Sequence, residues 1–134
     1  MWALLSALFA GLTAVLAKIG VRDVDSNLAT AIRTAVVLVF AWGIVLWGGV
    51  PRLELIPRRA WVFLTLSGLA TAASWLCYFR ALQLGPVSRV APIDKLSVVV
   101  AMGLGMLFLH EWLTWKEWLG GVLIVAGAVV LAYG

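Results

Sequence analysis

The sequence predicts an all-α integral membrane protein with five transmembrane helices. Of its 134 residues, 64% are hydrophobic and 12% are charged, whereas soluble domains carry roughly 25% charged residues. Apolar runs of about 17 to 20 residues recur five times, and each is close to the length that crosses a bilayer. The runs are continuous and do not alternate in polarity, which favours helices over a β-barrel. We expect one transmembrane domain over residues 1–134.

The first two helices are predicted at residues 2–20 and 27–48. Lys18 lies close enough to the end of the first helix for its ammonium group to reach the membrane surface. Ser26 is a plausible N-cap for the second helix, which the Gly48, Gly49, Val50, Pro51 stretch should end. Arg33 is predicted inside this helix, nearly two turns from its start.

The third and fourth helices are predicted at residues 57–84 and 86–109. Pro57 suits a first helical turn, where its missing N–H costs no hydrogen bond. Gly85 stops the third helix and Pro86 starts the fourth, so the pair should form a tight antiparallel hairpin. Pro92 removes a backbone hydrogen bond and should bend or loosen the fourth helix beside Asp94 and Lys95.

The fifth helix is predicted at residues 115–133. Thr114 and Glu117 have the spacing of a capping box, in which the two side chains satisfy exposed amide groups at a helix start. Five crossings place the chain ends on opposite sides of the membrane. We call the side of the N-terminus side A and the side of the C-terminus side B.

The distribution of charges and tryptophans tests this topology. Tryptophans gather near side A, as an interfacial aromatic belt requires: Trp2, Trp47, Trp61, Trp112, Trp115 and Trp118. Basic residues are almost evenly divided, with Arg52, Arg58, Arg59 and Lys116 on side A and Lys18, Arg22, Arg80 and possible contributions from Arg33 and Arg89 on side B. The balance indicates either a weak orientation signal or a chain that inserts both ways round.

Asp94 and Lys95 are the principal candidates for function. Counted from Gly85 at 1.5 Å per residue, Asp94 lies about 13 Å deep, where an ionised group costs about 2.5 to 3.5 kcal/mol on insertion scales. Both side chains should therefore face protein or water. Neighbours on a helix point about 100° apart, so we expect them not to pair with each other. Arg33 or Arg80 could reach Asp94, either in a substrate site or in a purely structural ion pair.

The third helix carries a polar stripe. Ser67, Thr71, Ser74 and Tyr78 recur at spacings of four, three and four, and Trp75 borders them. Close helix packing explains Ser67 and Thr71 well, because such hydroxyls bond to their own backbone. Trp75 and Tyr78 are deeper than interfacial anchors, so they are candidates for lining a pocket, with plain core filling as the alternative.

Several functions have no support in the sequence. The ten Lys and Arg residues are scattered and form no run longer than Arg58 and Arg59, which argues against nucleic-acid binding. Cys77 has no partner cysteine, and His110 with Glu111 lacks the second histidine of a metal site, which favours a surface or capping role. No catalytic or phosphate-binding motif is present. We therefore expect neither an enzyme nor a cofactor.

The stretch YFRALQLGPVSRVAPIDKLS at residues 78–97 resembles the EamA family of the drug/metabolite transporter superfamily. The resemblance continues through LFLHE at residues 107–111 and WLGGVLIVAGAVVL at residues 118–131, and Arg33 matches an arginine typical of the family's second helix. It covers most of the chain and is weakest in the first helix. Glycine is more usual in the family at the position of His110.

The resemblance implies a transporter of small metabolites in the inner (plasma) membrane, with a ten-helix core of two inverted five-helix halves. This chain supplies one half, so two oppositely inserted copies could form an antiparallel homodimer with alternating access. The first helix has no acidic residue, unlike small multidrug resistance exporters, which argues against proton-coupled export of lipophilic cations.

Basic residues outnumber Asp94 toward side B, which weakly favours substrates with a carboxylate, such as amino acids. The candidate site comprises Asp94, Lys95, Arg33, Arg80, Ser74, Trp75 and Tyr78. A lipid-linked sugar flippase subunit and a non-transporting membrane scaffold are the alternatives.

Overall fold

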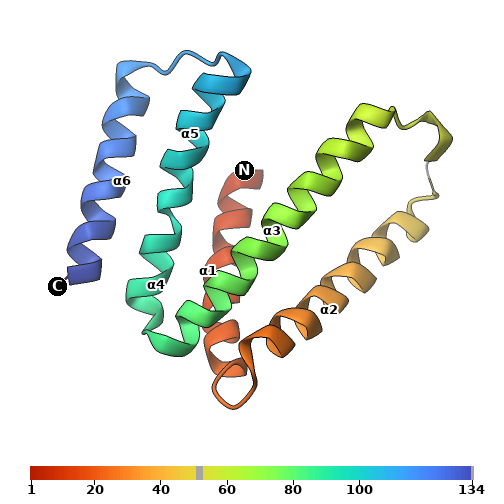
Figure 1. The fold of residues 1–134 in the computed structure, drawn as a ribbon, viewed down its shortest axis with the longest axis horizontal. Coiled ribbons are helices and arrows are strands. Elements are labelled where there is room, and N and C mark those ends of the chain that lie inside the picture. The colour runs from red at the N-terminus through yellow and green to blue at the C-terminus, as the bar shows by residue number, and fades with distance from the viewer. Residues whose placement is uncertain (51–52, 134) are drawn as a thin grey trace. The chain divides into compact units, whose positions relative to one another are not determined.

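The structure, a computed structural model that describes residues 1–50 and 53–133, consists of helices and short connections (Figure 1). Five helical segments are long and apolar enough to cross a membrane, which confirms the predicted fold class for the described residues. The fourth span, Val87–Leu109, contains two helices. In chain order the elements are α1 (Trp2–Gly20), α2 (Ser26–Trp47), the 3-10 turn η1 (Leu53–Leu55), α3 (Arg58–Leu84), α4 (Val87–Asp94), α5 (Leu96–Leu109) and α6 (Trp115–Tyr133).

The start of α2 differs from the prediction in its cap. Asp25 is the N-cap, and its Oδ1 atom accepts hydrogen bonds from the backbone N–H groups of Asn27 at 2.9 Å and Leu28 at 3.1 Å. Ser26, the predicted cap, is instead the first helical residue and is buried. Both side chains are good caps, but a carboxylate also gains from the positive end of the helix dipole.

The end of α2 follows the predicted stop. Gly48 is the C-cap, and its N–H donates to the Ile44 carbonyl. Gly49 then adopts φ +83°, a left-handed conformation that glycine reaches without steric cost. Pro51 and Arg52, also part of the predicted stop and loop, lie outside the described residues.

The chain divides into two compact units. The first comprises Met1–Val15 and Leu84–Gly134. Within it, α4 and α5 both pack against α6, and Figure 1 shows α5 and α6 running in opposite directions. Gly121 of α6 faces α5 at this contact, since a Cβ atom placed on it would lie 3.4 Å from the Met102 Cε atom, at van der Waals distance.

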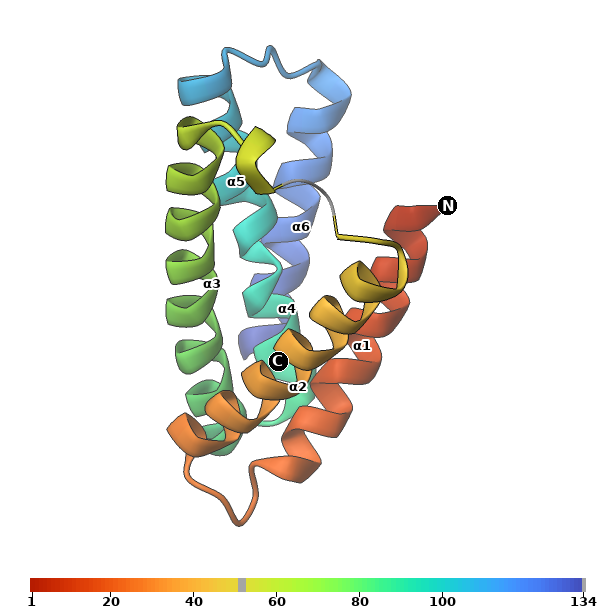
Figure 2. The ribbon, with the colours of Figure 1, turned by 90° about the vertical axis from the view of Figure 1, so that its right-hand side faces the viewer.

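The second unit comprises Leu16–Gln83. It contains α2 and most of α3, which run in opposite directions, and the turn that joins α1 to α2 (Figure 2). Its buried residues gather where this turn meets the end of α3 and comprise Val21, Ser26, Thr30, Phe79 and Leu82.

Most large apolar side chains on the five spans are exposed. Leu4 on α1, Val39 on α2 and Leu69 on α3 are 77%, 73% and 64% exposed, respectively. A helix that is apolar on all sides is stable only when hydrocarbon or another protein surface covers it. The chain is therefore a multi-pass membrane protein.

Candidate functional site

Arg33 lies against aromatic rings of α3. Its guanidinium carbon is 4.2 Å from the centroid of the Trp75 ring and 5.5 Å from that of Phe79. Trp75 and Phe79 are four residues apart on α3, so they present one face to α2. Arg33 is half-buried, and a cation–π contact contributes about 0.5 to 1 kcal/mol at an exposed site and about 2 kcal/mol or more where the cation is desolvated. This contact offsets part of the cost of holding a cation two turns inside a membrane-spanning helix.

Phe79 was not among the predicted site residues, although it is buried and belongs to this cluster. Its ring also packs edge to face against Tyr78, with centroids 6.5 Å apart. Its i, i+4 spacing from Trp75 was the sequence feature that could have indicated Phe79 as a member of the cluster. Without the position of Arg33, that spacing is equally typical of ordinary core packing.

The end of α3 holds a network of polar side chains. Gln83 Nε2 donates to the carbonyls of Val24 at 2.8 Å and Val21 at 3.2 Å, which anchors the turn between α1 and α2. Gln83 Oε1 accepts a hydrogen bond from Arg80 Nη1 at 3.1 Å. Lys18 Nζ donates to the Leu82 carbonyl. Arg80 is thus attached to a structural clamp that the sequence did not predict.

Asp94 and Lys95 form an ion pair. Lys95 Nζ is 3.4 Å from Asp94 Oδ2, so the expectation that these neighbours do not pair is wrong. Helix geometry explains the difference, because α4 ends at Asp94 and α5 begins at Leu96. The chain between them uses tighter i to i+3 hydrogen bonds, from Lys95 N–H to the Pro92 carbonyl and from Val98 N–H to the Lys95 carbonyl. The 100° separation of an ideal helix therefore does not apply.

The break itself confirms the predicted effect of Pro92. Proline has no N–H for the Ser88 carbonyl, and the helix ends two residues after it. The prediction that Arg33 or Arg80 reaches Asp94 concerns residues of different units and stays a prediction.

One hydroxyl of the polar stripe of α3 bonds to the helix's own backbone. Thr71 Oγ1 donates to the Ser67 carbonyl at 2.9 Å, the arrangement expected of a packing role. Ser74 is exposed, and Tyr78 is half-buried. A substrate role for Ser74, Trp75 and Tyr78 stays a prediction.

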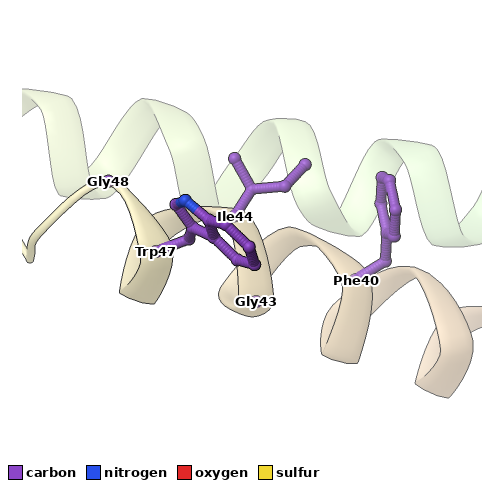
Figure 3. Close-up of a pocket in the computed structure, with 5 residues that line it drawn as sticks. All are labelled: Phe40, Gly43, Ile44, Trp47 and Gly48. Atoms are coloured by element: carbon purple, nitrogen blue, oxygen red, sulfur yellow. The ribbon is translucent and has the colours of Figure 1, made fainter.

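An apolar hollow of about 480 Å³ lies along the second half of α2. Figure 3 shows the side chains of Phe40, Ile44 and Trp47 around it, with Gly43 and Gly48 completing the lining. Its walls offer hydrocarbon and aromatic surface, which suits an acyl chain better than a polar solute.

His110 and Glu111 end the fourth span. His110 adopts φ 54° and is the C-cap of α5, in agreement with the predicted capping role. The chain turns back there, so that Glu111 N–H donates to the Gly105 carbonyl at 3.3 Å. A Cβ atom placed on Gly105 would lie 3.1 Å from Glu111 Oε2. Within residues 1–50 and 53–133, no group of three or more potential metal-ligating side chains is found.

Comparison with known proteins gives a match over nearly the whole chain. Residues 1–133 match the EamA-like transporter family. An uncharacterized transporter in the cobO 3′ region of a Sinorhizobium species is 56% identical over 132 residues, which cover 98% of this chain and 94% of that protein. No solved structure matches significantly.

Two further relatives are less similar and match over a smaller share of each chain. Protein RarD of Streptomyces exfoliatus is 29% identical over 106 residues, which cover 77% of this chain and 34% of that protein. A probable 4-amino-4-deoxy-L-arabinose-phosphoundecaprenol flippase subunit ArnE of Hamiltonella defensa is 27% identical over 77 residues, which cover 58% of this chain and 69% of that subunit.

Proposed function

Because this chain belongs to the EamA-like transporter family, we propose that it carries a small carboxylate-bearing metabolite, such as an amino acid, across the inner membrane. It does so by alternating access, as an antiparallel homodimer and without a cofactor. The family expected from residues 78–97 is confirmed. The substrate class, the membrane and the dimer belong to the proposal.

The contact of Arg33 with Trp75 is the observation that carries the substrate class. The 4.2 Å distance from the Arg33 guanidinium carbon to the ring centroid places the group over the Trp75 ring. The N–H donors of arginine lie in the plane of the guanidinium, where their fork matches the two oxygens of a carboxylate. A cation already positioned by aromatic rings is thus prepared to bind an anion in a bidentate manner.

The excess of basic residues supports the same class. A cleft lined with charges of one sign concentrates ligands of the opposite sign. In the part of the chain predicted toward side B, six basic residues stand against three acidic ones, namely Lys18, Arg22, Arg33, Arg80, Arg89 and Lys95 against Asp23, Asp25 and Asp94.

The odd number of spans supports the dimer. Two five-helix chains that insert in opposite directions produce the inverted repeat on which many transporters are built. The match to RarD covers 77% of this chain but 34% of that longer protein, so a longer relative has room for more than one such unit. The balanced charges of the two sides permit both orientations.

Flux measurements test the proposal. Purified protein in proteoliposomes should take up at least one of a panel of radiolabelled L-leucine, L-threonine, pyruvate and L-lactate. Arg33→Gln removes the planar cation and should lower this flux by about tenfold or more.

Arg59→Gln is the matched control. Arg59 also lies over an aromatic ring, 5.6 Å from the Phe63 centroid, but at the first turn of α3. Its flux should stay near that of the wild type. Equal losses in both variants would show that the Arg33 contact supports folding only, and absence of flux from the wild type for the whole panel would overturn the proposed substrate class.

A lipid-linked sugar flippase subunit is the second candidate. The similarity to the ArnE subunit and the apolar hollow on α2 favour it. In that case, a fluorescent undecaprenyl phosphate-sugar would cross the bilayer only in vesicles that contain the protein, and the water-soluble panel would not. A membrane scaffold would move neither class of compound.

A further inference from the structure

The aromatic rings beside Arg33 and the amide group of Gln83 lie on one face of α3. Trp75, Phe79 and Gln83 follow one another at intervals of four residues, so they form a single stripe. At 1.5 Å per residue, Gln83 lies about 12 Å beyond Trp75 along the helix axis. The stripe contacts Arg33 of α2 through its rings and the turn that leads into α2 through its amide. All of these residues belong to the second unit.

The amide group of Gln83 has one chemically consistent orientation. Its Nε2 atom donates to the carbonyls of Val24 at 2.8 Å and Val21 at 3.2 Å, and these groups can only accept. Its Oε1 atom accepts a hydrogen bond of 3.1 Å from Arg80 Nη1, which can only donate. A reversed amide would lose all three hydrogen bonds. Arg80 thus fixes which end of the amide faces the turn.

The turn that Gln83 holds also sets where α2 begins. Asp25, the residue after Val24, is the N-cap of α2, and its Oδ1 atom accepts hydrogen bonds from the first N–H groups of the helix. Arg33 follows in the same continuous helix. Residues 26–33 contain neither proline nor glycine, which are usual causes of a kink. A displacement of the turn is therefore transmitted to Arg33.

Other contacts constrain the guanidinium of Arg33 less well. In α2, which the structure describes in full, the buried residues are Ser26 and Thr30, and both precede Arg33. Val37 and Phe40, which continue the same face of the helix, are exposed. A cation–π contact forms anywhere within about 6 Å of the ring centre, so it does not fix the cation by itself. The hydrogen bonds of Gln83 supply the directional constraint.

We infer that Gln83 is a positioning residue. It holds α2 in the register that places the Arg33 guanidinium over Trp75, and thereby presents the N–H donors of Arg33 to the substrate carboxylate. Gln83 itself does not contact the substrate. A binding group must be held within roughly 0.5 Å of its productive position, and without these hydrogen bonds α2 can shift against α3. The part of the inference that concerns the substrate rests on the proposed function, whereas the position of Arg33 does not.

Fluorine NMR of the Trp75 ring tests the position of Arg33 without any substrate. Protein labelled with fluorotryptophan gives a resonance for each tryptophan, and Trp75→Phe identifies that of Trp75. Gln83→Met keeps a side chain of similar length but has no N–H donor. It should move the Trp75 resonance toward the position that Arg33→Gln gives. The double variant should match Arg33→Gln alone, because Gln83 acts on the ring only through the cation.

Thr65→Val is the matched control on the same helix. The Thr65 hydroxyl donates to the Trp61 carbonyl at 2.8 Å, the same length as the Gln83 bond to Val24, but this bond lies within α3 alone. Its loss should leave the Trp75 resonance at the wild-type position. Size-exclusion chromatography shows which variants fold, and Gln83→Leu replaces Gln83→Met if the latter does not. If neither variant folds, Gln83 supports the fold as a whole and the positioning role is overturned.

Transport kinetics test the consequence for the substrate. For a transported compound of the panel, Gln83→Met should raise the half-saturating concentration by about threefold or more, which corresponds to the loss of one hydrogen bond. The maximal rate per folded protein should stay close to that of the wild type. A residue that only supports folding would lower the maximal rate and leave the half-saturating concentration unchanged. Thr65→Val should change neither quantity.

The outcomes separate this inference from the proposed function. An unmoved Trp75 resonance in Gln83→Met, or a further shift in the double variant, would overturn the positioning role. A resonance that moves without a rise in the half-saturating concentration would overturn the link to substrate binding. A wild type that transports no member of the panel would overturn the proposed substrate class, while the resonance alone would still decide whether Gln83 positions Arg33.

Discussion

His110 adopts a backbone conformation that is unfavourable for a residue with a side chain. Among the described non-glycine residues it alone has a positive φ, 54°, at the point where α5 ends. A side chain in the left-handed region costs about 1 to 2 kcal/mol because its Cβ atom crowds the following carbonyl. This cost explains physically why glycine would suit the position.

His110→Gly should therefore raise the free energy of unfolding by about 1 kcal/mol. Thermal unfolding in detergent, followed by circular dichroism, measures the change. Gly49→Ala is the opposite control, since it adds a Cβ atom at φ +83° and should lower stability. A less stable His110→Gly would mean that the imidazole contributes through its contacts in the small hollow formed with Met106, Glu111 and Trp112.

At the scale of single elements, the start of α6 is the clearest case of local control. Thr114 N–H and Thr114 Oγ1 both donate to Glu117 Oε2, at 2.6 and 2.8 Å, and Glu117 N–H donates to Thr114 Oγ1 at 3.4 Å. The predicted capping box is therefore confirmed with both partners in place.

Thr114→Ala should cost about 1 kcal/mol of stability, because the first turn of α6 loses an acceptor for its amide groups. Thr65→Ala is the matched control: the Thr65 hydroxyl donates to the Trp61 carbonyl within α3, where the backbone is already satisfied. Detergent melting curves of the two variants test the difference. Equal losses of stability in the two variants would indicate that the capping box contributes no more than a threonine hydroxyl inside a helix does.

The packing of α6 depends on which glycine faces α5. A Cβ atom on Gly121 would lie 3.4 and 3.6 Å from Met102 Cε and Sδ, whereas one on Gly120 would meet nothing within 4 Å. Gly121→Leu should thus separate the helices and lower the melting temperature, because overpacking costs about 1 to 3 kcal/mol. Gly120→Leu should have little effect on the isolated chain. A larger loss of stability in Gly120→Leu than in Gly121→Leu would show that α6 packs through its other face.

At the scale of the whole molecule, the balance of basic residues leaves the orientation open. A population inserted both ways round should present its C-terminus on both sides of the membrane in comparable amounts. Cysteine labelling of a C-terminal tag in intact cells, before and after permeabilisation, measures the ratio.

Charge changes on one side should shift this ratio. Arg58→Glu with Arg59→Glu removes positive charge from side A, so side B should become the cytoplasmic side in most molecules. Asp23→Asn is the control, because acidic residues contribute little to orientation. If every molecule inserts in one orientation and the double variant leaves that orientation unchanged, the antiparallel dimer is overturned.

Much of the fold could be predicted from local patterns. Helix bounds, the connection at Gly85 and Pro86 and the break near Pro92 agree with the structure within one or two residues, and the antiparallel packing of the third and fourth helices stays a prediction. This agreement has a physical cause, since a helix in lipid satisfies its backbone groups within its own segment. Length, hydropathy and proline or glycine positions are therefore sufficient.

The sequence by itself determined a five-span membrane protein and the family to which it belongs. Only the tertiary structure decided that Arg33 lies on Trp75 and Phe79, that Gln83 anchors the turn after α1, and that Asp94 pairs with Lys95. The first two depend on residues more than forty positions apart, and the third on a departure from ideal helix geometry. A pattern of residue types specifies neither which distant residues come into contact nor where a helix departs from ideal geometry, because many arrangements of side chains satisfy the same periodicity.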